Sequence, residues 1–407
     1  MSRLEELIAE LCPNGVEYKK LNEVFHIKNG YTPSKAVASN WENGTISWFR
    51  MEDIRTNGRV LSSSIQKVSE SAIKSSGLFP KNSIIISTTA TIGEHALITV
   101  DFIANQQLTC LYRKNEFIDK INMKYIYHYF FIIDELCKKL VHKSGGMPIV
   151  DMEKFKKIKI PVPPLPVQEE IVRILDKFAE LTAELTAELT KRKQQYQYYC
   201  DKLLCYDKNN NKFPTVKVGD IATFTYGYTE KAKYTGSARF IRITDITENG
   251  CLNPYDAKFV DLTKENERYL LKEGDILMAR TGATYGKTLY IPNNEPAIYA
   301  SFLIKISLNN SKVINRFYWH FAQSTMYWQQ ADNLASKGGQ PQFNSNVLCK
   351  VLLPLPPIEE QERIVAILDR FDALCNDLTS GIPAEIEARK KQYEYYRDKL
   401  LTFKEAV

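Results

Sequence analysis

The chain has 407 residues, of which 44% are hydrophobic and 25% are charged, and its formal net charge is +6. These values are typical of a folded protein of two or more domains. The mild positive charge permits nucleic-acid binding without demonstrating it. No apolar run approaches the roughly 20 residues of a membrane helix, and the first residues lack a signal core. The eight cysteines form no CxxC pair, so we expect free thiols, no metal site and a cytoplasmic protein.

The first 160 residues alternate between short apolar runs and turns. Residues 3–11 predict a short helix, and Asn14-Gly15 predicts a turn. Strand-like runs follow at residues 84–86, 96–100 and 108–112, with one helical stretch at 124–140. This mixture predicts an α+β globular domain. Residues 143–148 are expected to form a flexible loop, and a strand at 158–162 leads into the next segment.

A long amphipathic segment follows the prolines at 163–164. Apolar residues recur there in steps of three and four, at Ile171, Ile174, Phe178, Leu181, Leu185 and Leu189. The pattern predicts one helix over residues 168–204, about 55 Å long at about 1.5 Å per residue. A helix of that length with a single apolar stripe needs a partner helix.

The same segment recurs near the C-terminus. Residues 356–401 repeat 163–204 and are the expected partner. The second copy carries four extra residues around 380–383. Gly381 and Pro383 therefore predict a kink or a break, with Pro383 opening a second helical segment.

The globular part is repeated as well. Gly30-Tyr31-Thr32 recurs as Gly227-Tyr228-Thr229, and Arg50 with Asp53 recurs as Arg242 with Asp245. The chain thus reads as a tandem duplication of an α+β domain, each copy followed by a long helix. The expected boundaries are 1–160 and 207–353 for the globular domains, and 161–206 and 354–407 for the helices. The helices match far better than the domains, which indicates that the helices share one role while each domain recognises something different.

The repeated motif has the form P-x-PP-[LI]-x-x-Q-x-x-I-V-x-I-L-[DE]-[KR]-F followed by [KR]-K-x-Q-Y-x-Y-Y-x-D-K-LL, at 161–204 and 354–401. It resembles the specificity subunit of type I restriction–modification enzymes, over nearly the whole chain. The resemblance implies two target recognition domains, each reading half of a bipartite asymmetric DNA site. It also implies two antiparallel helices that form a coiled-coil spacer. Such a subunit is not catalytic: it docks two modification subunits, which bind S-adenosylmethionine, and two restriction subunits join them.

Base readout needs side chains that reach base edges, and cations or backbone amides that reach phosphates. Two glycine-rich loops and nearby polar, basic and aromatic residues have this chemistry. The alternatives are an ordinary mobile loop, arginines paired with aspartates, and tyrosines of the core. The DNA-binding candidates are Tyr31, Lys35, Arg50, Arg55, Asn105, Gln106, Gln107, Lys143, Ser144, Gly145, Gly146, Tyr228, Lys231, Lys233, Arg242, Arg280, Lys337, Gly338, Gly339, Gln340 and Gln342.

The long helices carry more tyrosines than one apolar stripe needs. Since tyrosine favours protein interfaces, we expect Tyr196, Tyr199, Tyr393 and Tyr396 at subunit interfaces. The repetitive run at 182–190 predicts a unit whose length sets the spacing between half-sites.

Intrinsic catalysis finds little support. Residues 282–288 resemble a phosphate-binding loop but have three residues between the glycines rather than four. Asn253-Pro254-Tyr255 lacks the second proline of an adenine-methyltransferase motif, and five scattered histidines indicate no metal or Ser-His-Asp site. Two alternatives stay open: a two-domain protein-interaction scaffold without DNA specificity, and a self-sufficient methyltransferase or nuclease. Salt-sensitive binding to duplex DNA separates the first from a DNA-reading protein.

Overall fold

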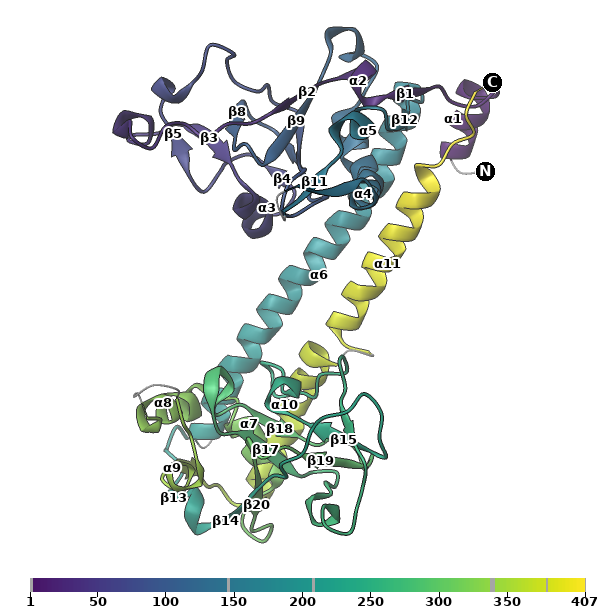
Figure 1. The fold of residues 1–407 in the computed structure, drawn as a ribbon. Coiled ribbons are helices and arrows are strands. Elements are labelled where there is room, and N and C mark those ends of the chain that lie inside the picture. Colours follow the sequence, from purple (N-terminus) through teal and green to yellow (C-terminus); the bar gives the residue numbers. More distant parts are fainter. Residues whose placement is uncertain (1–2, 145–146, 207–208, 337–340, 378–379, 407) are drawn as a thin grey trace. The chain divides into compact units, whose positions relative to one another are not determined.

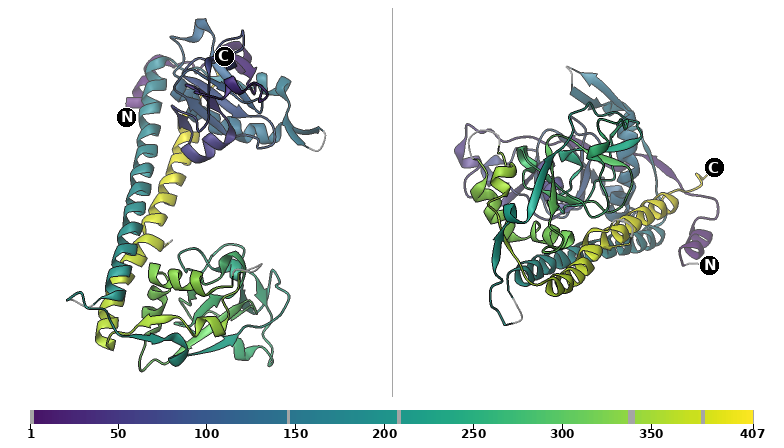
Figure 2. Two further views of the ribbon diagram at one scale, coloured as in Figure 1. Left: turned by 90° about the vertical axis from the view of Figure 1, so that its left-hand side faces the viewer. Right: turned by 90° about the horizontal axis from the view of Figure 1, so that it is seen from below.

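The computed structural model describes residues 3–144, 147–206, 209–336, 341–377 and 380–406 (Figures 1 and 2). The chain forms two compact units. Unit 1 comprises residues 1–183 with 388–407, and unit 2 comprises residues 184–387. The division therefore passes through the long helices, whereas the sequence placed the domain boundaries at their ends. No helix among the described residues is long and apolar enough to cross a membrane.

Unit 1 is built on a five-stranded sheet in the order β2-β9-β6-β7-β4. Its central strand, β6, contains three buried isoleucines whose side chains point alternately to the two faces of the sheet. Ile84 and Ile86 pack with helix α4, whereas Ile85 packs with Phe49 and Phe102 of a second sheet. The strands are β2 (Phe25–Asn29), β4 (Val60–Leu61), β6 (Ser83–Ser87), β7 (His95–Ile98) and β9 (Leu108–Arg113), and helix α4 spans Met123–Lys139.

The second sheet of unit 1 has three strands in the order β5-β3-β8, with β3 and β8 parallel. Its strands are β3 (Ile46–Phe49), β5 (Lys67–Val68) and β8 (Phe102–Ala104), and helix α3 (Met51–Asn57) follows β3. Helices α1 (Arg3–Leu11), α2 (Leu21–Val24) and α5 (Met152–Lys156) instead contribute to the core that the larger sheet shares with α4. Strand β1 (Tyr18–Lys20) pairs with β12 (Lys159–Pro161). The chain then passes from β12 into its first long helix. The predicted helices at 3–11 and 124–140 and the three predicted strands are confirmed.

Of the segment expected to be a flexible loop at 143–148, the described residues 143–144 and 147–148 lie instead in two paired strands, here called the hairpin. Strands β10 (Val141–Ser144) and β11 (Met147–Val150) pair in antiparallel register. Backbone hydrogen bonds attach the hairpin to the end of β6, because Ala90 N–H donates to Pro148 O and Val150 N–H donates to Thr88 O. Glycine and proline masked this strand pairing in the sequence.

Unit 2 repeats this plan. A four-stranded sheet has the order β14-β20-β17-β18, and a three-stranded sheet has the order β16-β15-β19. Two short helices, α7 and α8, occupy the place of α4. The elements are β13 (Thr215–Lys217), β14 (Ala222–Tyr226), β15 (Ala238–Ile241), β16 (Phe259–Val260), β17 (Ile276–Ala279), β18 (Thr288–Tyr290), β19 (Ala297–Tyr299), β20 (Leu303–Leu308), β21 (Leu352–Pro354), α7 (Asn315–Phe321), α8 (Thr325–Leu334) and α9 (Ser345–Leu348).

The first long helix, α6, spans Leu165–Cys205, three residues earlier than predicted at its start. Proline has no backbone N–H. Pro166 fits there because the N–H groups of the first helical turn have no acceptor within the helix, so no hydrogen bond is lost. The second copy is broken into α10 (Ile358–Asn376) and α11 (Ile382–Leu400), as Gly381 and Pro383 predicted. The expected fold class, a duplicated α+β domain with long helices, is confirmed.

The long helices pack against each other within each unit (Figure 1). In unit 1 the rings of Phe178 and Tyr396 stack with centroids 5.3 Å apart. In unit 2 Tyr199 and Phe371 stack at the same distance. The two pairs occupy equivalent positions in the repeat, so one contact is made twice.

Unit 1 is closed by its own C-terminal segment. Val16 N–H donates to Lys404 O, Ala406 N–H donates to Val16 O, and the Tyr18 hydroxyl donates to Phe403 O. Gly15 has a φ of +98°, and a Cβ there would lie 2.7 Å from Lys404 O. Only glycine accommodates this close approach.

Candidate nucleic-acid interface

In unit 1, polar residues of several loops gather at the strand ends of the larger sheet. In unit 1, Thr88 follows β6, and its hydroxyl lies 2.9 Å from that of Thr109, which donates to the Asn29 side chain. Gln106 bonds to Thr32, and Gln107 N–H donates to the Asn105 side chain. Because Thr88 and Thr109 are buried, the amides of Asn105, Gln106 and Gln107 are the groups of this cluster that suit base edges.

Strand pairing and backbone hydrogen bonds identify the counterparts of these residues in unit 2. Thr88 N–H donates to Gln107 O, as Arg280 N–H donates to Phe302 O. Val150 N–H donates to Thr88 O, as Phe343 N–H donates to Arg280 O. Thr88 therefore corresponds to Arg280, and Gln107 to Phe302. The same backbone hydrogen bonds therefore hold different side chains in the two units.

The predicted residues of unit 1 fall into two groups. Asn105, Gln106 and Gln107 lie together at the strand ends. Lys143 and Ser144 belong to the hairpin attached there. Arg55 reaches the same region, since it donates to the Thr91 hydroxyl over 3.1 Å and to Glu94 over 3.3 Å. The remaining predicted residues, Tyr31, Lys35 and Arg50, lie by the smaller sheet.

Tyr31 serves that smaller sheet as a structural residue. Its hydroxyl donates to Ala72 O over 3.2 Å and accepts from Lys74 N–H over 3.1 Å. Arg50 pairs with Glu52 over 2.9 Å and lies 5.2 Å from the Trp48 ring. Lys35 is exposed beside them and lines a hollow of about 390 Å³ with Arg50.

The repeated Arg and Asp residues have a structural task in both units. The buried side chains of Asp53 and Asp245 accept from the N–H groups of Arg50 and Arg242, at 2.7 Å each, and so cap the next helical turn. The Arg242 guanidinium also binds Asp245 through two nitrogens, which raises its pKa. The pairing with aspartate, which the sequence left open, is what the structure shows for Arg242.

The other predicted residues of unit 2 are spread over its surface. Lys231 and Gln342 are exposed, and Lys233 forms an ion pair with Asp261 over 2.8 Å. Tyr228 packs 5.5 Å from the Tyr269 ring. Arg280 and Gln342 meet at the strand ends, because Thr281 bridges Gln342. Gly145, Gly146, Lys337, Gly338, Gly339 and Gln340 lie outside the described residues.

A network that the sequence did not reveal joins each globular part to both long helices. In unit 1, His128 of α4 lies 2.8 Å from the Tyr393 hydroxyl of α11 and 2.9 Å from Asp176 of α6. In unit 2, His320 of α7 lies 2.9 Å from the Tyr196 hydroxyl of α6 and 2.8 Å from Asp369 of α10. We call each set a Tyr–His–Asp clamp. His128 and His320 are 192 positions apart, an offset also seen for Arg50 and Arg242, so the repeat itself carried the signal.

The electrostatics of the unit 2 clamp fix its protonation. Burial lowers the pKa of His320 and outweighs its bond to Asp369. Burial opposes ionisation of Asp369, but the bond from His320 and the charge of Arg316 bring its pKa below the usual value. Burial also raises the pKa of Tyr196 well above normal. A neutral imidazole between a phenol donor and a carboxylate acceptor satisfies all three groups.

The repeated glutamine of the motif acts beside each clamp. Gln168 accepts from Asn122 N–H over 2.8 Å and donates to Lys120 O and Pro163 O. Gln361 accepts from Ile314 N–H over 2.9 Å and donates to Lys312 O and Pro356 O. Both side chains are fully buried. The motif thus encodes the junction between each domain and its helix.

The four helix tyrosines predicted at subunit interfaces engage groups of their own chain, and their place at a subunit interface stays a prediction. Tyr196 and Tyr393 bond to the clamp histidines, while Tyr199 and Tyr396 stack on Phe371 and Phe178. The side chains beside them point outward: Tyr198 is 58% exposed and Tyr395 is 61% exposed. These two tyrosines occupy equivalent positions in the repeat.

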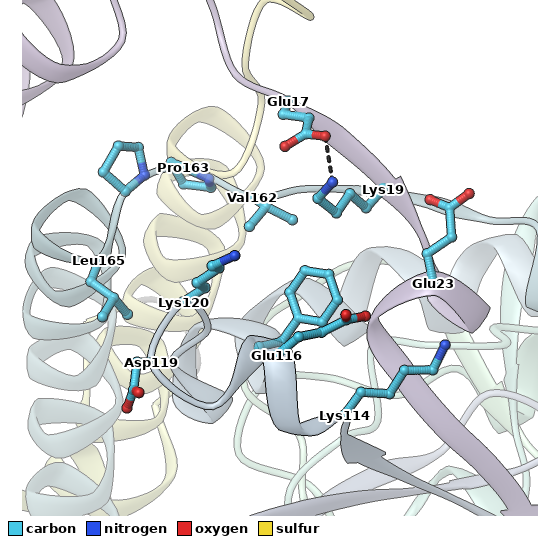
Figure 3. A pocket seen from close by; sticks show the side chains of 12 residues that line it. Glu17, Lys19, Glu23, Lys114, Glu116, Asp119, Lys120, Val162, Pro163 and Leu165 are labelled. Carbon is cyan, nitrogen blue, oxygen red and sulfur yellow. Dashed lines mark hydrogen bonds and ion pairs between the residues drawn. The ribbon is translucent and has the colours of Figure 1, made fainter.

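A hollow of about 800 Å³ in unit 1 has no counterpart among the predicted sites (Figure 3). Its lining mixes three lysines with four acids: Lys19, Lys114, Lys120, Glu17, Glu23, Glu116 and Asp119. Such a mixture does not suit a uniformly anionic backbone. Within the described part of the chain, no group of three metal-ligating side chains is present. The near-match at 282–288 runs into strand β18 rather than a helix, so it is not built as a phosphate-binding loop.

The family model for the type I restriction modification DNA specificity domain matches the chain twice, over residues 13–192 and 210–388. The chain therefore belongs to the family of type I restriction–modification specificity subunits and carries two DNA specificity domains. The two matches correspond to the two copies that the repeat predicts.

Curated relatives cover most of the chain. The type I restriction enzyme EcoprrI specificity subunit of Escherichia coli is 40% identical over an alignment of 397 residues, which covers 93% of this chain and 93% of the relative. The EcoR124I/EcoR124II specificity subunit of the same species is 34% identical over 314 residues, covering 70% of this chain and 72% of the relative.

Solved structures agree in fold. The S subunit from M. genitalium aligns over 95% of this chain and 96% of its own length, with a TM-score of 0.54 and 14% identity. A chain from a study of complex assembly and conformational transition of the type I R-M system aligns over 96% and 98%, with a TM-score of 0.58 and 18% identity.

Proposed function

We propose that this chain recognises a bipartite, asymmetric DNA sequence, with each unit reading one half-site. The observation that carries the proposal is the pair of equivalent strand ends that share a backbone frame and differ in side chains. Unit 1 exposes Gln107 where unit 2 exposes Phe302, and a buried Thr88 stands where unit 2 has the Arg280 side chain. Base readout varies with such side chains while the scaffold stays fixed. Two different readers in one chain require an asymmetric site.

The long helices serve as the spacer and as the docking surface for partners in this proposal. Each Tyr–His–Asp clamp fixes a reader to both helices of its unit. Tyr198 and Tyr395 expose the same aromatic group at equivalent positions, which suits two copies of one partner. The partners are two modification subunits that supply bound S-adenosylmethionine and the methyl transfer, together with two restriction subunits. The chain itself holds no catalytic residues and works in the cytoplasm.

Selection from a random duplex library tests DNA recognition. The tagged full chain is purified from the cells that encode it, together with the subunits that copurify. We expect an enriched motif of two half-sites with a constant gap, and an affinity that falls steeply with salt because counterions are released. Absence of any enriched sequence favours the protein-interaction scaffold. Methyl transfer by the chain alone favours the self-sufficient enzyme.

Deleting residues 185–188 tests the spacer. None of the four side chains at 185–188 is buried, so the deletion removes no core residue. Four residues shorten a helix by about 6 Å, or roughly two base pairs of duplex. We expect both half-sites to be retained and the gap to change by about two base pairs. Replacing the same residues by four alanines is the matched control, and it leaves the gap as it was. An unchanged gap after the deletion contradicts the spacer role.

A further inference from the structure

Arg280 stands at the carboxyl end of β17 in contact with two aromatic rings. Its guanidinium carbon lies 5.5 Å from the centre of the Tyr226 ring and 5.4 Å from that of Phe302. Its Nε donates to Ser301 O over 3.1 Å. The Tyr226 hydroxyl lies 2.9 Å from the Ser345 hydroxyl. We call Arg280, Tyr226, Phe302 and Ser301 the Arg280 cluster.

The backbone of the cluster is fixed as well. Arg280 N–H donates to Phe302 O over 3.1 Å, and Arg280 O accepts from Phe343 N–H over 2.8 Å. Strands β14, β17 and β20 are neighbours in one sheet, so Tyr226, Arg280 and Phe302 come from adjacent strand ends. Because the side chain is oriented before a ligand arrives, binding loses little conformational entropy.

The charge of Arg280 has no carboxylate partner among the described residues, and its two terminal nitrogens have no acceptor there either. Arg242 and Arg316, in contrast, each bind aspartate. The flanking rings are unusually open for large apolar groups, since Tyr226 is 41% exposed and Phe302 is 52% exposed. The guanidinium of Arg280 is thus fixed beside two exposed rings and is able to bind an acceptor from outside the chain.

The equivalent place in unit 1 is neutral. Thr88 is buried and bonds to Thr109, and Asn29 and Gln107 replace Tyr226 and Phe302. The two units therefore differ here in chemistry, with little change in backbone pairing.

We propose that Arg280 reads a guanine in the half-site bound by unit 2, through paired bonds to O6 and N7. This inference rests on the proposed function. A phosphate contact needs only charge, whereas the Nε bond and the two rings fix the plane of the guanidinium. Guanine is the base that presents two acceptors side by side in the major groove, and a planar fork matches them.

Library selection with Arg280→Gln and Arg280→Lys tests the assignment. Both variants lose the preference for guanine at one position of one half-site and keep every preference of the other half-site. Affinity for the wild-type motif falls roughly 10- to 100-fold, the usual value of a good bidentate contact. Lysine keeps the charge but not the fork, so its failure to restore the preference identifies base reading.

Lys264→Gln is the matched control, because Lys264 is exposed on the same unit and is not one of the DNA-binding candidates. It leaves every base preference as it was. Melting curves confirm that each variant is folded. If Arg280→Gln weakens all sequences equally and Arg280→Lys restores binding, Arg280 contacts phosphate and the assignment is overturned. Unchanged preferences in both variants overturn it too. If the wild-type chain itself enriches no motif, the proposed function fails and this assignment fails with it.

Discussion

The two units are most alike where they meet the long helices and least alike at their strand ends. Both junctions contain the same tyrosine, histidine and aspartate, and the same buried glutamine with its three hydrogen bonds. At the strand ends Thr88 of unit 1 is equivalent to Arg280 of unit 2, and Gln107 is equivalent to Phe302. A buried polar network tolerates few changes because each lost partner leaves an unsatisfied group. Exposed side chains at the strand ends, such as Gln107 and Phe302, carry no such constraint, so they are free to differ and to acquire different specificities.

The largest expected difference in stability between the two junctions comes from replacing the cation beside each clamp, which is Lys124 in unit 1 and Arg316 in unit 2. Arg316 binds Asp369 and Asp372 at 2.6 Å each, and its side chain is only 20% exposed. Lys124 binds Asp176 at 2.7 Å, but its side chain is 55% exposed. Arg316→Met should destabilise unit 2 by about 3 kcal/mol, because two aspartates lose their cation. Lys124→Met should cost unit 1 less than about 1 kcal/mol.

Hydrogen exchange of the full chain, resolved into peptides from each unit, measures both changes under one set of conditions. Peptides of α7 and α10 report on Arg316, and those of α4 on Lys124. Equal losses in the two units would show that burial does not distinguish the two ion pairs.

The clamp tyrosines should behave alike, in contrast to the cations. Burial raises the pKa of Tyr196 and of Tyr393, so both phenols stay protonated donors. Tyr196→Phe and Tyr393→Phe each leave a buried imidazole nitrogen without its donor, at a cost of about 1–3 kcal/mol. Although Tyr196 lies on α6, its loss should loosen α7 of unit 2, and the loss of Tyr393 on α11 should loosen α4 of unit 1. Exchange confined to the substituted helix would argue against the clamp.

Much of the fold follows from local pattern. Helix α6, the break before Pro383 and the strands at 84–86 and 108–112 all rest on periodicity or on Gly and Pro, which act within a few residues. The hairpin at 141–150 did not follow, because its glycines and proline indicate a turn while its strands depend on pairing.

The candidate site was less predictable, because its contacts join distant residues. The Tyr–His–Asp clamps join residues up to 265 positions apart. The sequence also does not distinguish the roles of Arg50, Arg242 and Arg280, because these roles depend on the groups that each arginine contacts. The two clamp histidines are separated by 192 positions, the same offset as Arg50 and Arg242 in the repeat. Comparing polar positions between the two copies therefore gives more information than either copy alone.

The smallest effect expected is a pH dependence of unit 2. Tyr196, Asp369, Asp372 and Arg316 surround His320, and burial lowers its pKa below the ordinary value of 6.5. The unfolded chain therefore binds a proton on this histidine at a pH where the folded chain does not. Stability is full above about pH 6.5 and declines as pH falls toward the folded pKa, by at most about 1.4 kcal/mol per pH unit.

His320→Gln keeps a polar group in the clamp and removes the titration. It should lower the stability of unit 2 at pH 7.5 and flatten its decline between pH 6.5 and 5. His95→Gln is the matched variant, since burial also lowers the pKa of His95 in unit 1. Urea unfolding across this pH range, with exchange assigning each transition to a unit, separates the two. If unit 2 of the His320 variant declines as steeply as the wild type, another group controls its acid sensitivity, and His320 is not held neutral by burial.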